Sequence, residues 1–335
     1  MRLSETFTQL PLICDSALLR KEVSGLDERD WRAHPSQFNG NSAALLITVN
    51  GEENDSLAHV GQFKPTPLLS RMPYTRQIMR SLQAPLSRSR FMRVAPACQV
   101  PLHNDVGWHW FRRVRVHVPV ITTPEVIFHC AGRSIHMAAG EVWIFDNFED
   151  HSVDNDSELF RIHLVIDVVP TAAFFDLVRR GRHPFGTSNP GFQPRPVAPI
   201  TGVEAQLPIE SHEMSGFTPS ELSTIVRDIG ADLAGLRPER GASMAKAELR
   251  KFSGAVARDN DYESCRNAAR RLCSALLPVY HASALGKTSG RDMLAVLYAM
   301  SFGQDKPRAF ERFRRWSAAL LRGEHLSKPR QAETR

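Results

Sequence analysis

The feature that most limits the fold of this chain is a series of short, strand-like segments between residues 89 and 169. The segments are rich in β-branched and aromatic residues, and turn residues such as those at 131–133 and 139–140 separate them. The expected strands are 90–95, 99–103, 113–120, 125–129, 134–137, 141–145 and 160–169. A series with this spacing is typical of a β-sandwich, a barrel or a jelly roll.

Helical patterns flank the strand-rich segment on both sides. Before it, Asp15 can cap a short helix that runs to Val23, and Pro73 can begin a second helix that runs to Gln83. An apolar run at 43–49 lies between these two helices. We therefore expect mixed structure in the first 90 residues.

The second half of the chain changes character after residue 182. Residues 183–199 are rich in proline and glycine, as in a linker. Beyond them, residues 218–221 form a capping box that begins one helix. Four more helices are expected at 243–257, 262–284, 291–301 and 307–321. The sequence thus predicts three parts: a mainly β domain at 1–182, a linker at 183–199 and an α-helical domain at 200–335.

The net charge of +6 is concentrated in the second half of the chain. Residues 1–170 hold 17 basic and 19 acidic side chains, whereas residues 171–335 hold 25 basic and 17 acidic ones. A basic half can attract nucleic acid, an acidic protein or an anionic surface. Here the charges are scattered over predicted helices without interleaved aromatic residues that could stack on bases. We therefore expect an ordinary solvated surface and no nucleic-acid partner.

Several other classes of protein are excluded by composition. No apolar run approaches the roughly 18 residues that a membrane helix needs. The apolar stretch at 10–13 is too short for a signal peptide, and Glu5 and Asp15 flank it. The five cysteines form no CxxC pair, so neither a zinc knuckle nor a disulfide framework is indicated. We expect a soluble, cytoplasmic protein that does not bind a membrane, and its oligomeric state stays open.

A possible metal motif lies inside the strand-rich segment, at His103-Asn104-Asp105. In extended backbone His103 and Asp105 point to the same side, because alternate side chains share a face. His151 follows 46 residues after Asp105. Two histidines and one carboxylate are the ligand set of a facial triad that binds Fe(II) and leaves positions open. Because the chain has 13 histidines, such combinations arise easily by chance, so this motif alone is weak evidence for a metal site.

Two expected strands repeat a pattern in which arginine and histidine alternate with apolar residues. The polar sets are Arg113, Arg115 and His117 on one strand, and Arg161, His163 and Asp167 on the other. Either these side chains face solvent on a one-sided sheet, or they line the mouth of a barrel. In a barrel mouth a buried guanidinium needs an anion, and a carboxylate bound through two hydrogen bonds would suit Arg161 or Arg115.

The order and spacing of several motifs together resemble a known family. The motifs are Gly61–Thr66, Pro73-Tyr74, His103 with Asp105, Arg115–Pro119, Gly140–Asn147, His151 and Arg161–Leu164. Together they resemble the aspartyl/asparaginyl β-hydroxylase-like family of Fe(II)- and 2-oxoglutarate-dependent oxygenases, which includes the L-proline cis-hydroxylases. The resemblance implies a double-stranded β-helix, the jelly-roll or cupin-like fold, with the α-helical region C-terminal to it.

The same resemblance implies roles for named residues. His103, Asp105 and His151 would hold iron at the catalytic centre. Arg161 would bind the far carboxylate of the co-substrate 2-oxoglutarate, and Arg115 and His117 would line that pocket. O2 would be the second co-substrate.

The substrate is indicated by one departure within the family. The position of Asp105 looks like glycine in the members that modify peptides, whereas the hydroxylases of free amino acids have aspartate there. Trp108 and Trp110 are then candidates for a substrate wall, although aromatic packing accounts for them equally well. His163 shares the face of Arg161 and is a further candidate for contact with the substrate.

The expected function is hydroxylation of an unactivated C–H bond of a free, proline-like amino acid, with release of succinate and CO2. An amino-acid residue in a peptide is the first alternative, and an amino acid on an acidic carrier protein is the second. Only the basic second half, including Arg308, Arg312, Arg314 and Arg315, suggests the carrier. A cupin-type binding or regulatory protein without turnover is the alternative from another class.

Overall fold

The computed structural model describes residues 1, 3–34, 38–54, 61–105, 108–187, 189–200, 206–210, 219–236, 240–258, 262–282, 290, 293–294 and 297. The chain divides into two compact units, which are described separately. The first contains Met1–Asp105 and His109–Glu213, and the second contains Val106–Trp108 and Met214–Arg335.

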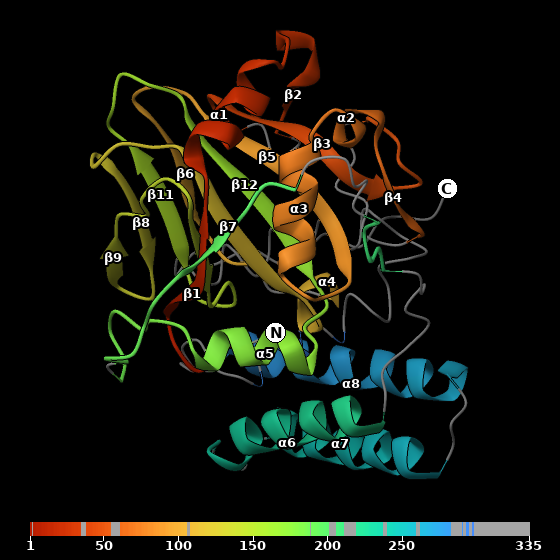
Figure 1. The fold of residues 1–335 in the computed structure, drawn as a ribbon. Coiled ribbons are helices and arrows are strands. Elements are labelled where there is room, and N and C mark those ends of the chain that lie inside the picture. Colours follow the sequence, from red (N-terminus) through yellow and green to blue (C-terminus); the bar gives the residue numbers. More distant parts are fainter. Residues whose placement is uncertain are drawn as a thin grey trace, which may run out of the picture. The chain divides into compact units, whose positions relative to one another are not determined.

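The first unit is built on strands, with helices beside them (Figure 1). Its strands are β1 (Phe7–Cys14), β2 (Arg32–Ala33), β3 (Asn41–Val49), β4 (Phe63–Pro65), β5 (Leu86–Val94), β6 (Cys98–His103), β7 (Val114–Ile121), β8 (Val126–Cys130), β9 (Arg133–Ile135), β10 (Glu141–Phe145), β11 (His151–Asn155), β12 (Arg161–Val168) and β13 (Arg195–Val197). Its helices are α1 (Ser16–Ser24), the 3₁₀ turn η1 (Glu28–Asp30), α2 (Pro67–Ser70), α3 (Pro73–Ser81), α4 (Trp108–Phe111) and α5 (Ala172–Arg179).

These strands form two sheets. The larger has the order β13-β1-β10-β7-β12-β5-β3-β2, with β4 beside β3, and the smaller has the order β6-β11-β8-β9. Neighbouring strands are antiparallel except for β13, which runs parallel to β1. Between β5 and β12 the chain passes back and forth between the sheets, and the predicted double-stranded β-helix is confirmed.

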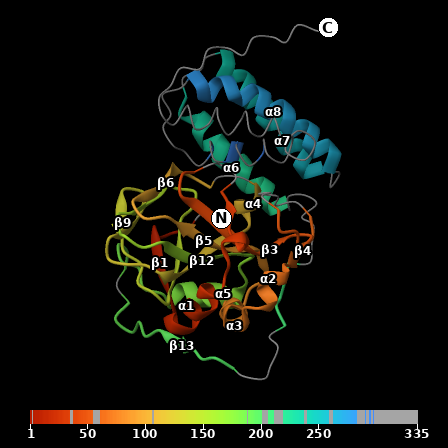
Figure 2. The same cartoon turned by 90° about the horizontal axis from the view of Figure 1, so that it is seen from above.

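The outer face of the large sheet is covered by helices. Val114, Val116 and Val118 of β7 belong to one apolar core with the alternating apolar residues of β12 and the buried faces of α1, α3 and α5. Figure 2 shows these three helices gathered on one side of the strands. Asp15 begins α1 as expected, since its carboxylate accepts hydrogen bonds from the amides of Ala17 and Leu18.

The inner face of the large sheet is turned toward the small sheet. A second apolar core combines Phe145 and Trp143 of β10 with Phe128 of β8 and Val153 of β11. The polar sets of β7 and β12 are buried on the same inner face, and every residue of β12 is buried. The explanation in which these side chains face solvent is therefore wrong.

All seven expected strands are present, with ends that differ by a few residues. The strands that the sequence does not predict are β1, β2, β4, β11 and β13. The sequence of β11, His-Ser-Val-Asp-Asn, is too polar to resemble a strand, and pairing with β6 and β8 on both sides stabilises it. The predicted linker contains β13, which pairs with β1 through Leu12, Ile13 and Cys14.

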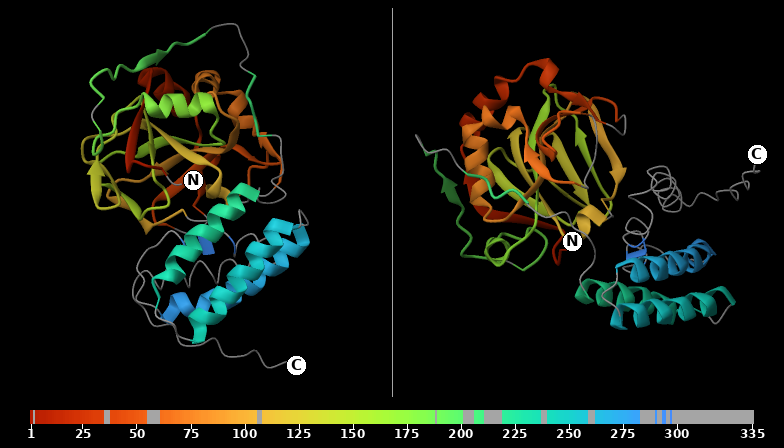
Figure 3. Two further views of the ribbon diagram at one scale, coloured as in Figure 1. Left: turned by 90° about the horizontal axis from the view of Figure 1, so that it is seen from below. Right: turned by 90° about the vertical axis from the view of Figure 1, so that its right-hand side faces the viewer.

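The second unit contains α6 (Pro219–Ala234), α7 (Arg240–Arg258) and α8 (Tyr262–Ala282), which Figure 3 shows side by side in green to blue. Apolar residues at helical spacing face the interior of this unit, including Ile225 and Ile229 of α6, Phe252 of α7 and Leu272 of α8. The helices expected at 291–301 and 307–321 lie outside the described elements. Among the described residues, no helix combines the length and the hydropathy needed to cross a membrane.

Candidate metal centre and its polar surroundings

His103, Asp105 and His151 converge, as the sequence predicts. His103 ends β6 and His151 begins β11, and the two residues are paired across the small sheet. Their rings lie 4.2 Å apart, and Nε2 of His151 lies 4.0 Å from Oδ2 of Asp105. One donor atom from each of the three residues lies within 4.8 Å of the others. The small sheet therefore brings together two histidines and a carboxylate from distant parts of the sequence.

Two hydrogen bonds hold the turn that carries Asp105 against the loop before His151. The amide of Asp105 donates to the carbonyl of Asn147 at 2.8 Å. The side-chain amide of Asn104 donates to Oδ1 of Asp150 at 3.0 Å. Contacts of this kind orient groups in a metal site without binding the metal.

The histidine rings are presented in the form that binds a metal. Nδ1 of His103 lies 2.7 Å from the carbonyl oxygen of Pro101, and Nδ1 of His151 lies 2.9 Å from that of Glu149. Because a carbonyl oxygen only accepts, both rings must carry their proton on Nδ1. The lone pair of Nε2 is then available in each ring, and each ring orientation is held by backbone two residues earlier.

The charge states also suit a divalent metal. Burial, together with the nearby His103, lowers the pKa of His151 to about 4, so its ring is neutral near pH 7. Burial acts to raise the pKa of Asp105, but the cation of Arg115 and the two histidines outweigh it, and the pKa lies below its usual value. Nitrogens of two histidine rings and one carboxylate oxygen are the donor set suited to ferrous iron.

Arg115 connects the metal cluster to a second buried carboxylate. Its Nη1 donates to Oδ2 of Asp105 at 2.7 Å, and its Nε donates to Oδ1 of Asp167 at 3.0 Å. The guanidinium also lies 4.0 Å from the centre of the Trp110 ring. Arg115 thus binds two carboxylates of the chain itself, and its expected contact with 2-oxoglutarate stays a prediction.

Within the described part of the chain, Arg161 differs from Arg115 in having no carboxylate partner. It is 2% exposed, and its Nη2 lies 2.7 Å from Nδ1 of His163. Among the described residues its Nε has no hydrogen-bond partner, and burial lowers its pKa to about 9. A buried guanidinium without a counter-ion is costly, so this position favours an anionic ligand.

His117 and His163 lie beside Arg161. Their Nδ1 atoms are 3.4 Å apart, and in the described chain the Nε2 atom of each ring lacks a hydrogen-bond partner. Burial and the nearby Arg161 lower the pKa of both rings well below the usual value. Two neutral rings and one unpaired cation therefore stand together on the inner face.

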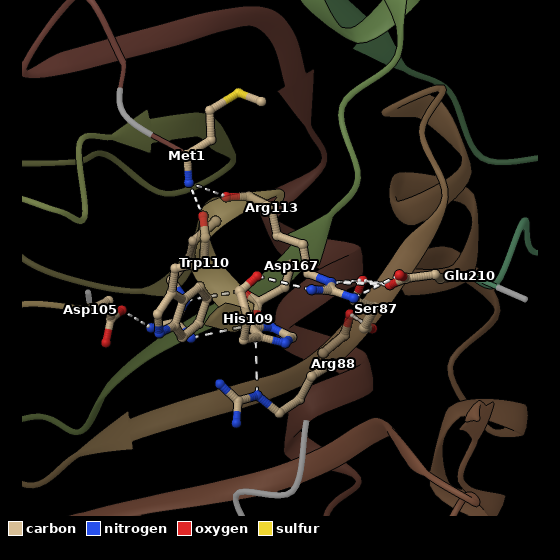
Figure 4. Close-up of polar contacts among 11 residues, drawn as sticks. Met1, Ser87, Arg88, Asp105, His109, Trp110, Arg113, Asp167 and Glu210 are labelled. Atoms are coloured by element: carbon tan, nitrogen blue, oxygen red, sulfur yellow. Dashed lines mark hydrogen bonds and ion pairs between the residues drawn. The ribbon is translucent and has the colours of Figure 1, made fainter. Parts of the chain in front are cut away.

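A further polar network extends from Asp105 to Glu210 (Figure 4). Arg113 binds Glu210 through two hydrogen bonds, with Nη2 to Oε1 at 2.6 Å and Nε to Oε2 at 3.0 Å. Ser87 donates to the same carboxylate. Next to this pair, His109 contacts Asp167, with its Nε2 3.1 Å from Oδ2.

The network includes residues that sequence reasoning missed or left without a role. Arg88 and Arg90 of β5 are buried on the inner face, and Glu210 joins from a segment after the predicted linker. The alternation Ser87-Arg88-Ser89-Arg90 is the signal that could have identified the two arginines. No local signal points to Glu210, because its partner Arg113 is 97 residues away.

Of the two tryptophans predicted to line the substrate site, the structure describes the side chain of Trp110 and only the backbone of Trp108. Trp110 is buried, and the cations of Arg115 and Arg88 lie over its ring. It therefore contacts the charged network, and its role as a substrate wall stays a prediction. The backbone of Trp108 begins α4, but its side chain lies outside the described part of the structure.

Comparison with known proteins supports the resemblance that the motifs indicate. Residues 37–170 match the family model described as aspartyl/asparaginyl beta-hydroxylase, so the expected resemblance is confirmed. The chain is also 27% identical over 180 residues to the L-proline cis-4-hydroxylase of Rhizobium meliloti (strain 1021). That similarity covers 52% of this chain and 64% of the relative, so the match spans less than two thirds of the relative's length.

Similar solved structures include an oxidoreductase of the 2OG-Fe(II) oxygenase family from Burkholderia pseudomallei. It is 15% identical with a TM-score of 0.32, over 45% of this chain and 76% of the other. A prolyl-4-hydroxylase from Pseudomonas putida is 13% identical with a TM-score of 0.34, over 50% of this chain and 95% of the other.

Proposed function

We propose, from the family match over residues 37–170, that this protein is an Fe(II)- and 2-oxoglutarate-dependent hydroxylase of an amino acid. One observation carries the proposal: two histidines and a carboxylate converge at the small sheet, and the large sheet that faces it buries an arginine, Arg161, which has no counter-ion among the described residues. The cluster suits ferrous iron, and the arginine suits one end of a dicarboxylate.

Each group of the site would have a separate task. His103, Asp105 and His151 would bind the iron through two nitrogens and one oxygen. Arg161 would bind the far carboxylate of 2-oxoglutarate, which orients that molecule before reaction. When bound, iron and 2-oxoglutarate supply the activation of O2 that hydroxylates a C–H bond and releases succinate and CO2.

The residues around the cluster would keep it dry and correctly charged. The rings of Phe145 and Phe128 lie 4.8 Å and 6.3 Å from that of His151, where their apolar surface would exclude water from one side of the ring. Arg115 keeps Asp105 ionised, because its cation favours the carboxylate form. Low local dielectric then strengthens the attraction between these groups and charged ligands.

The proposal is tested by measuring O2 uptake and succinate formation with Fe(II), 2-oxoglutarate and a panel of amino acids. Wild-type protein should form succinate, and at least one amino acid should increase its rate. Arg161→Met should raise the concentration of 2-oxoglutarate for half-maximal rate about 10- to 100-fold, since a charge-assisted contact is lost. Arg93→Met is the matched control, because Arg93 pairs with the exposed Glu28 instead.

The alternative of a binding protein without turnover makes a different prediction. Such a protein would bind iron at the three residues but would form no succinate with any member of the panel. That result, obtained with protein shown to contain iron, would exclude the hydroxylase.

A further inference from the structure

Asp167 is a buried carboxylate that is joined to the candidate metal cluster through Arg115. It lies in β12, directly opposite Arg115 of β7 in the large sheet, and it is 1% exposed. Burial acts to raise its pKa, but the cation of Arg115 and the hydrogen bond from His109 outweigh burial, and the pKa lies below the usual value. Asp167 is therefore ionised near pH 7.

Asp167 fixes one edge of the guanidinium of Arg115. Nε of the arginine donates to Oδ1 of Asp167 at 3.0 Å, and Nη2 donates to Oδ2 at 3.5 Å. Two contacts of this kind set the plane of a guanidinium as well as its position. The ring centre of Trp110, 4.0 Å from the guanidinium carbon, restricts it further. The remaining nitrogen, Nη1, donates to Oδ2 of Asp105 at 2.7 Å.

Asp167 is itself held in place. Its strand, β12, lies between β5 and β7 in the large sheet, which fixes its backbone. Nε2 of His109 lies 3.1 Å from Oδ2 of Asp167 (Figure 4). Because an ionised carboxylate only accepts, the ring of His109 carries a proton on Nε2 and donates it to Asp167. Arg115 is thus oriented by a carboxylate whose backbone and side chain are both restrained.

Glu210 and Arg113 form a second buried pair with the same chemistry. Arg113, which immediately precedes β7, donates to both carboxylate oxygens of Glu210. Its Nη1, however, donates to the backbone carbonyl of His109 and not to a candidate metal ligand. The two pairs are alike in burial and in hydrogen bonding. They differ in whether the arginine also binds Asp105.

The loss of Asp167 would change how Arg115 binds Asp105. Nε and Nη2 would be released, and the guanidinium could turn until two of its nitrogens face Asp105. A pair with two hydrogen bonds is the preferred geometry of arginine with a carboxylate. It would occupy both oxygens of Asp105 and compete with a metal for them.

We propose that Asp167 is a positioning residue for the metal centre: it binds one edge of Arg115, so that Arg115 donates a single hydrogen bond to Asp105 and leaves this carboxylate able to bind the metal. The inference rests on the metal site of the proposed function. Residues that orient metal ligands without binding the metal typically change metal affinity about 10- to 100-fold when they are replaced.

The test measures the Kd for Co(II) at pH 7 by titration of its absorption spectrum, with residues 1–335 and without 2-oxoglutarate. Asp167→Asn keeps the shape of the side chain but can accept only one of the two hydrogen bonds from Arg115. We expect it to raise the Kd about 10- to 100-fold. Glu210→Gln is the matched control and should leave the Kd within about twofold.

A second measurement separates metal affinity from stability. Both variants should lower the urea concentration at which the metal-free protein unfolds, because each removes a charge that faces a buried guanidinium. Only Asp167→Asn should also weaken Co(II) binding. A merely structural role for Asp167 would make the two variants alike in both measurements, and an equal rise of the Kd in Glu210→Gln would overturn the inference.

A double variant separates positioning from direct attraction between Asp167 and the metal. Arg115→Met should raise the Kd for Co(II) by itself. If Asp167 acts through Arg115, adding Asp167→Asn to Arg115→Met should cause no further rise. Effects that multiply in the double variant would show that Asp167 acts by its own charge, and the inference would be wrong.

His109→Phe tests the same connection while it keeps the charge of Asp167, and it decides the matter if Asp167→Asn does not fold. It removes the hydrogen bond to Oδ2 of Asp167 and should raise the Kd for Co(II) about 2- to 10-fold. Tight Co(II) binding by wild-type protein, with the same Kd in the Asp167 or His109 variant, would overturn this inference and leave the proposed function standing. Wild-type protein that binds no Co(II) would instead reject the metal site of the proposed function, and this inference with it.

Discussion

Nη1 of Arg115 lies 2.7 Å from Oδ2 of Asp105, the carboxylate of the candidate metal cluster. The arginine reaches the cluster from β7, on the sheet opposite the two histidines. Both sheets therefore contribute to the charge of one site. This relationship makes the ionisation of Asp105 depend on a residue that is not itself a ligand.

Replacing Arg115 with methionine should raise the pH that is needed for the metal to bind. Without the cation, burial raises the pKa of Asp105 with less opposition, so protons compete with the metal up to a higher pH. The pH at which Co(II) half-saturates the protein, measured by its absorption spectrum, should increase. Arg93→Met should leave that pH unchanged, and an unchanged value for Arg115→Met would show that the ion pair does not control Asp105.

Alanine at His103, Asp105 or His151 should abolish tight metal binding, because a site with two remaining protein ligands binds weakly. We expect the Kd for Co(II) to rise at least about 100-fold in each variant. His129→Ala is the matched control, since His129 lies on the same small sheet but pairs with Ser134 and Asp154. If the Asp105→Ala variant still bound Co(II) tightly, Asp105 would not be a ligand of the metal.

The buried histidines should make the folded protein sensitive to mild acid. Burial lowers the pKa of His109, His117 and His163 well below that of an exposed histidine. Below about pH 6.5 the unfolded chain binds protons on these rings while the folded chain does not. The stability they contribute is therefore complete above about pH 6.5 and declines as the pH falls further. Each ring adds up to about 1.4 kcal/mol per pH unit to this slope.

Urea unfolding of the metal-free protein between pH 7 and pH 5 measures that slope. His109→Gln should reduce it by removing one buried ring, whereas His129→Gln should change it less, because the side chain of His129 is 35% exposed. An unfolding free energy that does not depend on pH in this range would contradict the assignment of neutral buried rings.

The buried pair of Arg113 and Glu210 should contribute to stability as a unit. Glu210→Gln leaves the guanidinium of Arg113 without its counter-ion, at an expected cost of about 3–5 kcal/mol in the free energy of unfolding. The double variant Arg113→Met with Glu210→Gln should be more stable than the single variant, since no uncompensated charge remains. Additive losses in this cycle would show that the two side chains do not interact.

Local sequence patterns determined much of the architecture. Alternating apolar residues identified the strands around Val114–Ile121 and Arg161–Val168, because side chains in a strand alternate between two faces wherever the strand lies. The same rule placed His103 and Asp105 on one side of the chain from their spacing alone. Caps such as Asp15 marked the helix starts, since their hydrogen bonds are local.

The tertiary structure decided which of these faces are buried and which distant residues meet. Alternation separates the two faces of β12, but only the second sheet shows that the face with Arg161 and His163 is covered. His151 meets His103 through the register of β11 on β6, and Glu210 meets Arg113 across 97 residues. Such contacts depend on how separate segments pack, and because packing is a property of the whole chain, no local pattern encodes them.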